Sequence, residues 1–192
     1  MVMVSIPRQE RNRHWTAAEL RAIPDDRNRY EIVDGELLVT PAPAPRHQRL
    51  LRELFLDLQR YLVANPVGEL FFSPADIELS DDTVVQPDLF VIPLSDGESP
   101  EEWSEVGRLL LAVEVLSPST ARWDRTLKRR LFQRAGVPEY WIVDGDARLV
   151  ERWRPDDERP EISAEVFEWR PGGAKAPLML DLAGMFGRVL GE

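Results

Sequence analysis

Three charged residues stand at positions where the surrounding pattern expects apolar side chains. Glu114 lies in LLLAVEVL (109–116), Asp88 lies in VVQPDLFVI (84–92), and Lys128 lies in the basic segment that follows Glu114. An ionised carboxylate in an apolar strand is costly unless it is paired or binds a cation. Two carboxylates about 4 Å apart repel by roughly 4 kcal/mol at an effective dielectric constant near 20, so a proton or a cation is needed between them. A neighbouring lysine favours chemistry on an anionic oxygen.

The helix expected after Glu114 determines how Lys128 is oriented. At 100° per residue the apolar residues of 123–135 share one face, with Asp124 in the middle of that face and Lys128 toward its side. This pattern directs Lys128 toward the sheet, whereas its basic neighbours point away. An ordinary Asp124–Lys128 ion pair between positions i and i+4, worth about 0.2–0.5 kcal/mol, is an equal alternative.

Composition limits the metal and the class of protein. The chain has 192 residues, no cysteine, and two histidines, His14 and His47. Disulfides, thiolate zinc sites and cysteine nucleophiles are excluded, and any metal must be held mainly by carboxylates, which favours Mg²⁺ or Mn²⁺. No apolar run approaches the roughly 18 residues of a membrane span, so a cytoplasmic protein without membrane contact is the default expectation.

The charge distribution bears on nucleic-acid binding. The formal net charge of −10 argues against a protein that only coats nucleic acid, because nonspecific affinity comes from Lys and Arg at phosphates. The segment 121–135 is a local basic exception, in which Arg122, Arg125 and Arg129 could contact a backbone beside the site. The alternative is a solvated helix face, paired with the acidic loop 95–105.

The elements that would position these residues follow from local patterns. Residues 29–40 are expected to form a hairpin that turns at Asp34-Gly35, and the leucines repeated every four positions predict a helix over 46–64. A second helix is expected to run to Ala135. Strands are expected at about 68–72, 75–80, 84–92, 109–116, 139–144, 148–154, 162–169 and 177–180, with a short helix near 181–187. Residues 1–14 are interpreted as a flexible lead-in, and 15–192 as one α/β (α+β) domain with a mixed sheet and flanking helices.

Several phrases resemble a known family. Gln86-Pro87-Asp88, followed by Val113-Glu114-Val115, is similar to the signature of PD-(D/E)XK nucleases. Within that superfamily the chain resembles the Uma-type restriction endonuclease family over about Trp15 to Trp153. The matching phrases are YEIVDGEL (30–37), PAPAPRHQ (41–48), TVVQPDLFV (83–91), VEVLSPST (113–120) and RAGVPEYWIVD (134–144).

The resemblance implies a restriction-endonuclease-like αβββαβ core in which Asp88 and Glu114 are metal ligands. The superfamily pattern expects a lysine two residues after the glutamate, where this chain has Leu116. In the family this lysine is expected to have moved to the next helix, which matches Lys128. Glu31 and His47, which lie in the family-like phrases, and Asp124 are second-tier candidates. For His47, a role at the start of a helix or in the core is an equal alternative.

The sequence therefore predicts a Mg²⁺- or Mn²⁺-dependent endonuclease that acts on nucleic acid, with DNA as the expected substrate. In this hypothesis Asp88 and Glu114 hold the metal, while Lys128 orients the attacking water or stabilises developing negative charge. A homodimer would suit the cutting of both strands of a duplex. The alternative is a noncatalytic nuclease-fold module that binds nucleic acid or protein, motivated by Leu116 and the acidic surface.

A different hydrolase that uses the carboxylate pair is a third hypothesis. Glycoside hydrolases use such pairs as acid and base, but their sites usually carry aromatic sugar platforms. Trp141, Trp153 and Trp169 could form a stacking surface, yet at strand spacing they are expected in the core or half-buried on the sheet.

Overall fold

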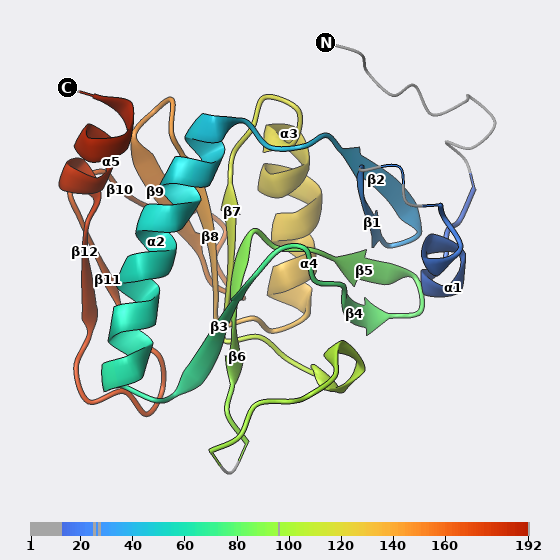
Figure 1. The fold of residues 1–192 in the computed structure, drawn as a ribbon, viewed down its shortest axis with the longest axis horizontal. Helices are drawn as coiled ribbons and strands as arrows, with labels where there is room; N and C mark the ends of the chain where they lie inside the picture. The colour runs from blue at the N-terminus through green and yellow to red at the C-terminus, as the bar shows by residue number, and fades with distance from the viewer. Residues whose placement is uncertain (1–12, 25, 27, 96, 192) are drawn as a thin grey trace.

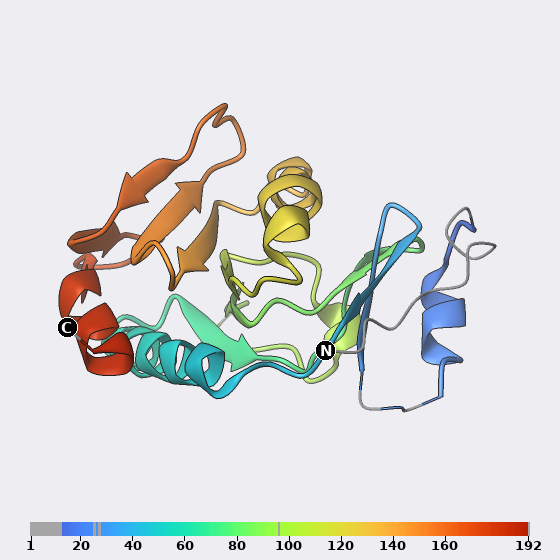
Figure 2. The same cartoon turned by 90° about the horizontal axis from the view of Figure 1, so that it is seen from above.

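The structure is a computed structural model that describes residues 13–24, 26, 28–95 and 97–191. The lead-in expected over residues 1–14 therefore lies almost wholly outside the described residues. A central sheet with helices on both faces forms the body of the molecule, and a smaller sheet lies at one end (Figures 1 and 2). No helix in the described part of the chain is long and apolar enough to cross a membrane.

The central sheet has six strands in the order β10-β9-β8-β7-β6-β3. In chain order these strands are β3 (Gly68–Phe72), β6 (Leu89–Pro93), β7 (Leu111–Val115), β8 (Glu139–Asp144), β9 (Leu149–Trp153) and β10 (Glu161–Ser163). β7 runs parallel to β8, and every other neighbouring pair is antiparallel. All five residues of β7 are buried, as expected for a strand that is covered on both faces.

Alternate residues of the sheet face two different helical layers. One face carries Val113 and Val115, which belong to the same core as the leucines of α2 (Pro45–Ala64). The other face carries Ala112 and packs against the helical segment between β7 and β8, which consists of α3 (Ala121–Trp123), a π-helical turn η2 (Asp124–Lys128) and α4 (Arg129–Arg134). Figure 2 shows the two helical layers on opposite sides of the sheet. Glu114, which alternates with Val113 and Val115, faces the η2 side.

The smaller sheet has the strand order β2-β1-β5-β4. Its strands are β1 (Arg29–Val33), β2 (Glu36–Thr40), β4 (Ile77–Ser80) and β5 (Thr83–Val85). The hairpin predicted over 29–40 is confirmed, with positive φ at both turn residues, 51° at Asp34 and 78° at Gly35, as a type I′ turn requires. Two short helices lie outside the layers, α1 (Ala17–Arg21) and η1 (Trp103–Glu105).

The single strand predicted over 84–92 is wrong, because Gln86-Pro87-Asp88 divides it. Residues 83–85 pair with β1 and β4 of the smaller sheet, whereas 89–93 pair with β3 and β7 of the central sheet. Pro87 has no N–H to donate to either ladder, so the chain passes from one sheet to the other there. The strand predicted at 75–80 likewise belongs to the smaller sheet. Asp88 consequently lies where the two sheets meet.

The strand expected at 148–154 is β9 of the central sheet, but the strands expected at 162–169 and 177–180 do not all join that sheet. Residues 162–169 divide into β10 and β11 (Val166–Trp169), and β11 pairs with β12 (Leu178–Asp181) in a separate two-stranded sheet. Phe167 and Trp169 alternate with exposed residues and contact Trp141 edge-on, so this sheet covers the core beside α5 (Leu182–Leu190). Burial of the three tryptophans at 141, 153 and 169 confirms the core interpretation.

Candidate active site

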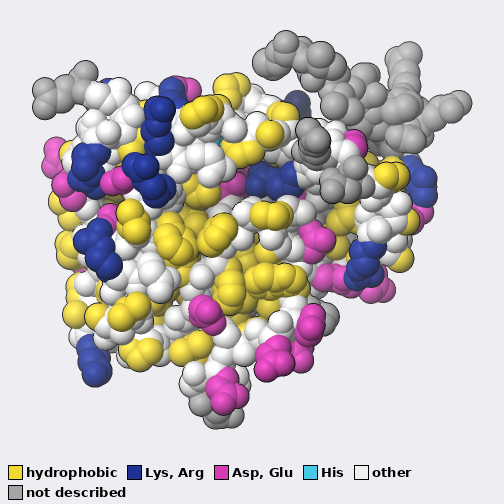
Figure 3. Space-filling model, viewed as in Figure 1, with side chains coloured by type: hydrophobic (Ala, Val, Ile, Leu, Met, Phe, Trp, Pro, Cys, Tyr) yellow, Lys and Arg dark blue, Asp and Glu magenta, His cyan; other side chains and the backbone are white. Residues whose placement is uncertain are grey.

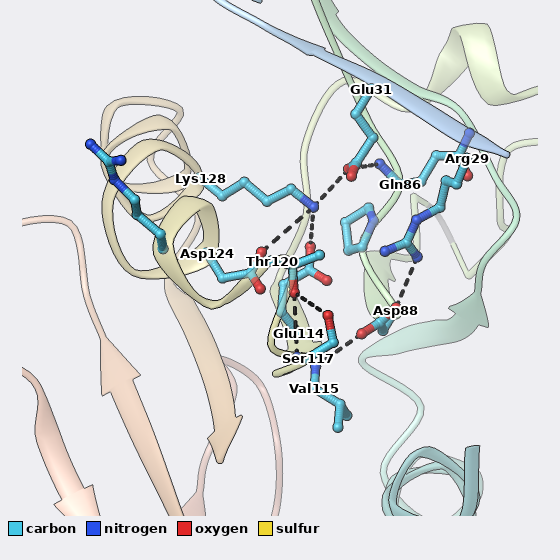
Figure 4. Close-up of polar contacts among 12 residues, drawn as sticks. Arg29, Glu31, Gln86, Asp88, Glu114, Val115, Ser117, Thr120, Asp124 and Lys128 are labelled. Carbon is cyan, nitrogen blue, oxygen red and sulfur yellow. Dashed lines mark hydrogen bonds and ion pairs between the residues drawn. The ribbon is translucent and has the colours of Figure 1, made fainter. Parts of the chain in front are cut away.

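Asp88 and Glu114 lie beside one another on neighbouring strands. Leu89 of β6 is paired with Val113 of β7, and one further step in this antiparallel register sets Asp88 opposite Glu114. The backbone N–H of Val115 donates a hydrogen bond to Oδ2 of Asp88 over 2.9 Å. Both carboxylates are buried, with exposed fractions of 3% and 2%. The two sequence candidates for metal ligands therefore share one buried position (Figure 4).

Lys128 reaches the same position from η2, in the helical layer that Glu114 faces. Its Nζ lies 2.8 Å from Oε1 of Glu114 and 2.8 Å from Oε1 of Glu31, and 3.9 Å from Oδ1 of Asp124. The i,i+4 pair with Asp124 exists, but it is the longest of the three contacts. The ammonium group therefore lies among three carboxylates that come from different elements (Figure 4).

A π-helical turn holds Lys128 and Asp124 against the sheet. The sequence predicted a regular α-helix here, whereas the N–H of Arg129 donates to the carbonyl of Asp124, five residues earlier. The hydroxyl of Tyr140 on β8 also donates to that carbonyl, over 3.2 Å. Such turns are frequent at functional sites, because they redirect side chains that a regular helix would space differently.

Asp88 is held by one guanidinium and one imidazole side chain. Nη1 of Arg29 lies 2.9 Å from Oδ1, and Nε2 of His47 lies 2.9 Å from Oδ2. His47 stands in the first turn of α2 and thus contacts the site instead of only filling the core. Arg29 was not among the sequence candidates. Arg29 lies two residues before Glu31 in the same strand, so the two side chains share one face of the sheet. This spacing was the sequence signal that could have identified Arg29.

Glu31 reaches the site from the smaller sheet. Its Oε1 accepts a hydrogen bond of 2.8 Å from the backbone N–H of Gln86, and its Oε2 is buried without a hydrogen-bond partner among the described residues. Gln86 is a second residue that the sequence interpretation missed, because it acts through its backbone. The connection between β5 and β6 thus supplies Asp88 and also orients Glu31.

Burial raises the proton affinity of two carboxylates on the Lys128 side. The pKa of Glu114 lies well above its usual range, because burial disfavours its charge more than Lys128 favours it. Burial also raises the pKa of Asp124 to about 6, again against the attraction of Lys128. The pKa of Lys128 is raised, because Glu114 and Glu31 outweigh the opposing effect of burial. Glu114 and Glu31 therefore favour the protonated form of Lys128.

Asp88 differs from these two carboxylates. Burial alone would raise its pKa, but hydrogen bonds and positive charge from His47 and Arg29 outweigh burial and hold the pKa below its usual range. Asp88 is accordingly ionised at neutral pH, whereas Glu114 and Asp124 compete for protons. The site therefore combines one carboxylate that is ionised at neutral pH with two that would release protons when a cation binds.

The donor atoms fit a hard divalent cation. Carboxylate oxygens are the ligands that Mg²⁺ and Mn²⁺ prefer, and Oε2 of Glu31 and both oxygens of Asp124 are buried without hydrogen-bond partners among the described residues. In the described conformation these carboxylates are arranged around Lys128 and Arg29, and no group of three or more acidic, histidine or cysteine residues in the described ranges is set around a common metal position. The carboxylate oxygens are suitable ligands for a cation that would share Asp88 and Glu114 with Arg29 and Lys128.

A cavity of about 680 Å³ opens onto this cluster. Arg29, His47, Asp88, Val115 and Thr120 are among its lining residues. Glu114, Lys128 and Glu31 do not line it, so they lie beneath the polar floor that Asp88 forms. A molecule in the cavity would therefore meet Asp88, Arg29 and His47 first.

The three arginines considered for nucleic-acid contact lie outside this cavity. Arg125 donates to Asp144 and Glu151 on the adjoining strands, and Arg129 lies over the ring of Trp153. Arg125 thus pairs with strand residues and not with the acidic loop 95–105. Arg122 is exposed.

Comparisons with known proteins agree with this architecture. The family model described as "Putative restriction endonuclease" (Uma2) matches residues 17–182. A solved structure described as a "putative nuclease belonging to DUF820" from Anabaena variabilis has a TM-score of 0.73 and 20% sequence identity, covering 92% of this chain and 99% of its own. No curated protein matches the chain. The expected fold, a mixed sheet flanked by helices, is confirmed, and the chain belongs to the Uma2 family, whose description is "Putative restriction endonuclease".

Proposed function

We propose that the protein is a Mg²⁺- or Mn²⁺-dependent endonuclease that hydrolyses phosphodiester bonds in DNA. Asp88 and Glu114 would hold the cation, with Glu31 and Asp124 as further carboxylates within the same buried cluster. The observation that carries the proposal is the ammonium of Lys128, 2.8 Å from Glu114, next to the pair of Glu114 and Asp88, of which Asp88 lines an open cavity. The family assignment supports nuclease activity, without specifying the metal or the type of nucleic acid.

Each charged residue has a distinct part in this proposal. Asp88 stays ionised near neutral pH, because Arg29 and His47 depress its pKa against the effect of burial, and it therefore offers a standing negative charge. Lys128 keeps its proton, so it acts as a hydrogen-bond donor and electrostatic stabiliser and not as a general base. Arg29, which lines the cavity, would bind a non-bridging phosphate oxygen in a charge-assisted hydrogen bond.

A divalent cation, when bound, lowers the pKa of a coordinated water and polarises a phosphoryl oxygen. Glu114 has to be unprotonated in that state, although burial raises its pKa. The burial of Glu114, Glu31 and Lys128 beneath the cavity excludes bulk water from the charged cluster, which strengthens each electrostatic interaction.

Cleavage assays on isosteric variants test the proposal. Supercoiled and linear DNA are incubated with Mn²⁺ or Mg²⁺ and with the wild type, Asp88→Asn, Glu114→Gln and Lys128→Met. We expect each substitution to lower the cleavage rate by at least about 100-fold, the size of effect seen when a group that stabilises a transition state is removed. Asp144→Asn is the matched control, since Asp144 is a partly buried strand-end carboxylate that pairs with Arg125 outside the cavity. Undiminished cleavage by both carboxylate variants would overturn the metal-ligand assignment.

A noncatalytic binding module is the second candidate, and one observation favours it. Both oxygens of Asp88 already accept hydrogen bonds from Arg29, His47 and the N–H of Val115, so a cation would compete with these donors for the carboxylate. In that case the protein would bind nucleic acid or another protein without cutting. Nucleic-acid binding that is unaltered by Mn²⁺, with no cleavage in any metal, would favour this candidate.

A further inference from the structure

The cavity above Asp88 has the wrong size for a double helix. Its volume of about 680 Å³ lies within the range of about 300–1,000 Å³ that holds a molecule of drug or nucleotide size. A base in a duplex is stacked and paired, and it can enter such a cavity only after leaving the stack. A nucleic acid that places a base inside this cavity therefore has that nucleotide separated from its neighbours.

The walls suit a flat, uncharged heterocycle. Four prolines line the cavity at positions 41, 43, 74 and 118, joined by Leu51 and Phe72. Prolines present rigid apolar surfaces and carry no backbone N–H, so much of the wall cannot donate hydrogen bonds to water. Gln48, Ser117 and Thr120 add a few polar groups among the lining residues. Apolar walls with a few polar groups are typical of sites that bind a ring and fix its orientation.

Phe72 is an exposed aromatic residue at this cavity. It ends the edge strand β3, and 57% of its surface is exposed. The ring of Phe55 meets it edge-on, with centroids 5.5 Å apart and an interplanar angle of 87°. In the space-filling view, apolar side chains gather in the middle of the face that carries α2 and β3 (Figure 3). Among the described residues, Phe72 is the exposed large hydrophobic side chain that lines the cavity.

The position of Phe72 relative to Asp88 links the aromatic ring to the charged floor. Phe72 is the strand partner of Leu89, the residue after Asp88. The next residue, Ser73, donates its backbone N–H to the carbonyl of Asp88 over 3.2 Å. Phe72 and Asp88 thus line the same cavity and lie one residue apart along two paired strands. Aromatic side chains beside a cationic groove are the usual means of holding unpaired bases.

We infer that the cavity binds one unpaired nucleotide, with its base stacked on Phe72 and its phosphate at Arg29 above Asp88. The inference rests on the proposed function for its choice of nucleic acid as ligand. It adds a substrate class, which is single-stranded DNA or DNA with an unpaired nucleotide at the scissile bond. Arg29 is suited to the phosphate, because its side chain remains 21% exposed while Nη1 contacts Asp88.

Binding measured without cleavage tests the inference. Fluorescence anisotropy in EDTA gives the Kd of a labelled 12-nucleotide single strand and of the corresponding duplex for wild type, Phe72→Ala, Phe72→Tyr and Ile162→Ala. Ile162 is a matched control, since it is an exposed apolar residue on β10, away from the cavity. We expect tighter binding of the single strand than of the duplex. Stacking worth about 1–3 kcal/mol per base predicts a loss of about 5- to 150-fold for Phe72→Ala with the single strand, with affinity near wild type for Phe72→Tyr and Ile162→Ala.

A 2-aminopurine base in the single strand gives an independent readout of stacking. Its fluorescence is expected to be quenched on binding to the wild type and to recover with Phe72→Ala. Wild-type affinity of Phe72→Ala for the single strand, an equal loss for the duplex, or no binding of single strands at all would overturn the inference. Cleavage is measured separately from binding. Binding that depends on Phe72 without any cleavage supports this inference and contradicts the nuclease proposal. Cleavage that Phe72→Ala leaves unaffected supports the nuclease proposal and contradicts this inference.

Discussion

The ammonium nitrogen of Lys128 lies 2.8 Å from Oε1 of Glu114, and each of the two side chains is only 2% exposed. The same nitrogen contacts Glu31 at the same distance, so one buried cation serves carboxylates from β7 and β1. Such a cluster is stable only while its charges balance, because removal of one partner leaves a buried charge without compensation.

Replacement of Lys128 is expected to destabilise the fold strongly. Lys128→Met leaves Glu114 and Glu31 buried without their cation, and the free energy of unfolding at pH 8 should fall by about 3–5 kcal/mol. The chain's other lysine, Lys175, is exposed, and Lys175→Met should change stability by less than about 0.5 kcal/mol. Urea denaturation measures both. A double variant Lys128→Met/Glu114→Gln that recovers part of the loss identifies charge, and not packing, as the cause.

Asp124 gives the protein an unusual dependence of stability on pH. Because burial raises its folded pKa from 3.8 to about 6, the folded protein holds this proton more tightly than the unfolded chain does. The free energy of unfolding therefore falls as the pH rises through about 4 to 6, by about 3 kcal/mol for this group. Asp124→Asn should remove the share of the decline that Asp124 contributes, leaving that of Glu114, and should be the more stable protein at pH 8.

Asp144 supplies a control of opposite sign for this pH experiment. Burial would raise its pKa, but backbone N–H groups and Arg125 outweigh burial and lower it. Its contribution is therefore present above its unfolded pKa and is lost as the pH falls. Asp144→Asn should lower stability at pH 8, as followed by thermal unfolding across pH 4–8. A loss of stability at pH 8 in Asp124→Asn would contradict the assigned role of Asp124.

Metal binding is expected to stabilise the wild type and to depend on pH. At a Mn²⁺ concentration of 100 times the Kd, binding to the folded state adds about 2.7 kcal/mol, which raises the melting temperature by several degrees. The increase should be smaller at pH 5 than at pH 8, because Glu114 and Asp124 must release protons. Asp88→Asn should remove the shift and Asp144→Asn should retain it. An equal shift in all three proteins would mean that Mn²⁺ binds elsewhere.

Arg29 is expected to affect metal affinity and cleavage in opposite directions. Its guanidinium competes with a cation for Oδ1 of Asp88, so Arg29→Gln should tighten Mn²⁺ binding by about tenfold, or about 1.4 kcal/mol. The same variant loses the proposed phosphate contact and should cleave more slowly. Calorimetric titration and a cleavage assay measure the two effects. Arg134→Gln is the control, since Arg134 pairs with Asp34 at the exposed surface. Weaker Mn²⁺ binding in Arg29→Gln would refute the competition.

The basic helix face makes a separate prediction about salt dependence. Arg122 is exposed, whereas Arg125 is bound to Asp144 and Glu151. If the helix borders bound DNA, Arg122→Ala should reduce the slope of log K against log salt by about 1. Arg125→Ala should leave the slope unchanged and reduce stability instead. Salt titrations of binding with both variants separate these outcomes, and unchanged slopes in both would remove this helix from the interface.

The sequence by itself determined many of the local elements and the unusual carboxylates. Local periodicity predicted the hairpin at Asp34-Gly35 and the helix over 46–64, observed as Pro45–Ala64, because both signals are complete within a few residues. Asp88 and Glu114 were visible as charges in apolar strands. The inward orientation of Lys128 also followed from helical spacing, although the π-helical turn around it did not.

Only the tertiary structure decided which charges meet. Arg29 contacts Asp88 although 59 positions of the chain separate them, and Glu31 contacts Lys128 from the smaller sheet. Both contacts depend on how the two sheets join at Pro87. No local pattern encodes such a junction, since the strand signal over 84–92 is continuous while its hydrogen-bond partners change. Ion pairing among buried groups is decided by the packing of distant elements, whereas periodicity reports only which face of one element is buried.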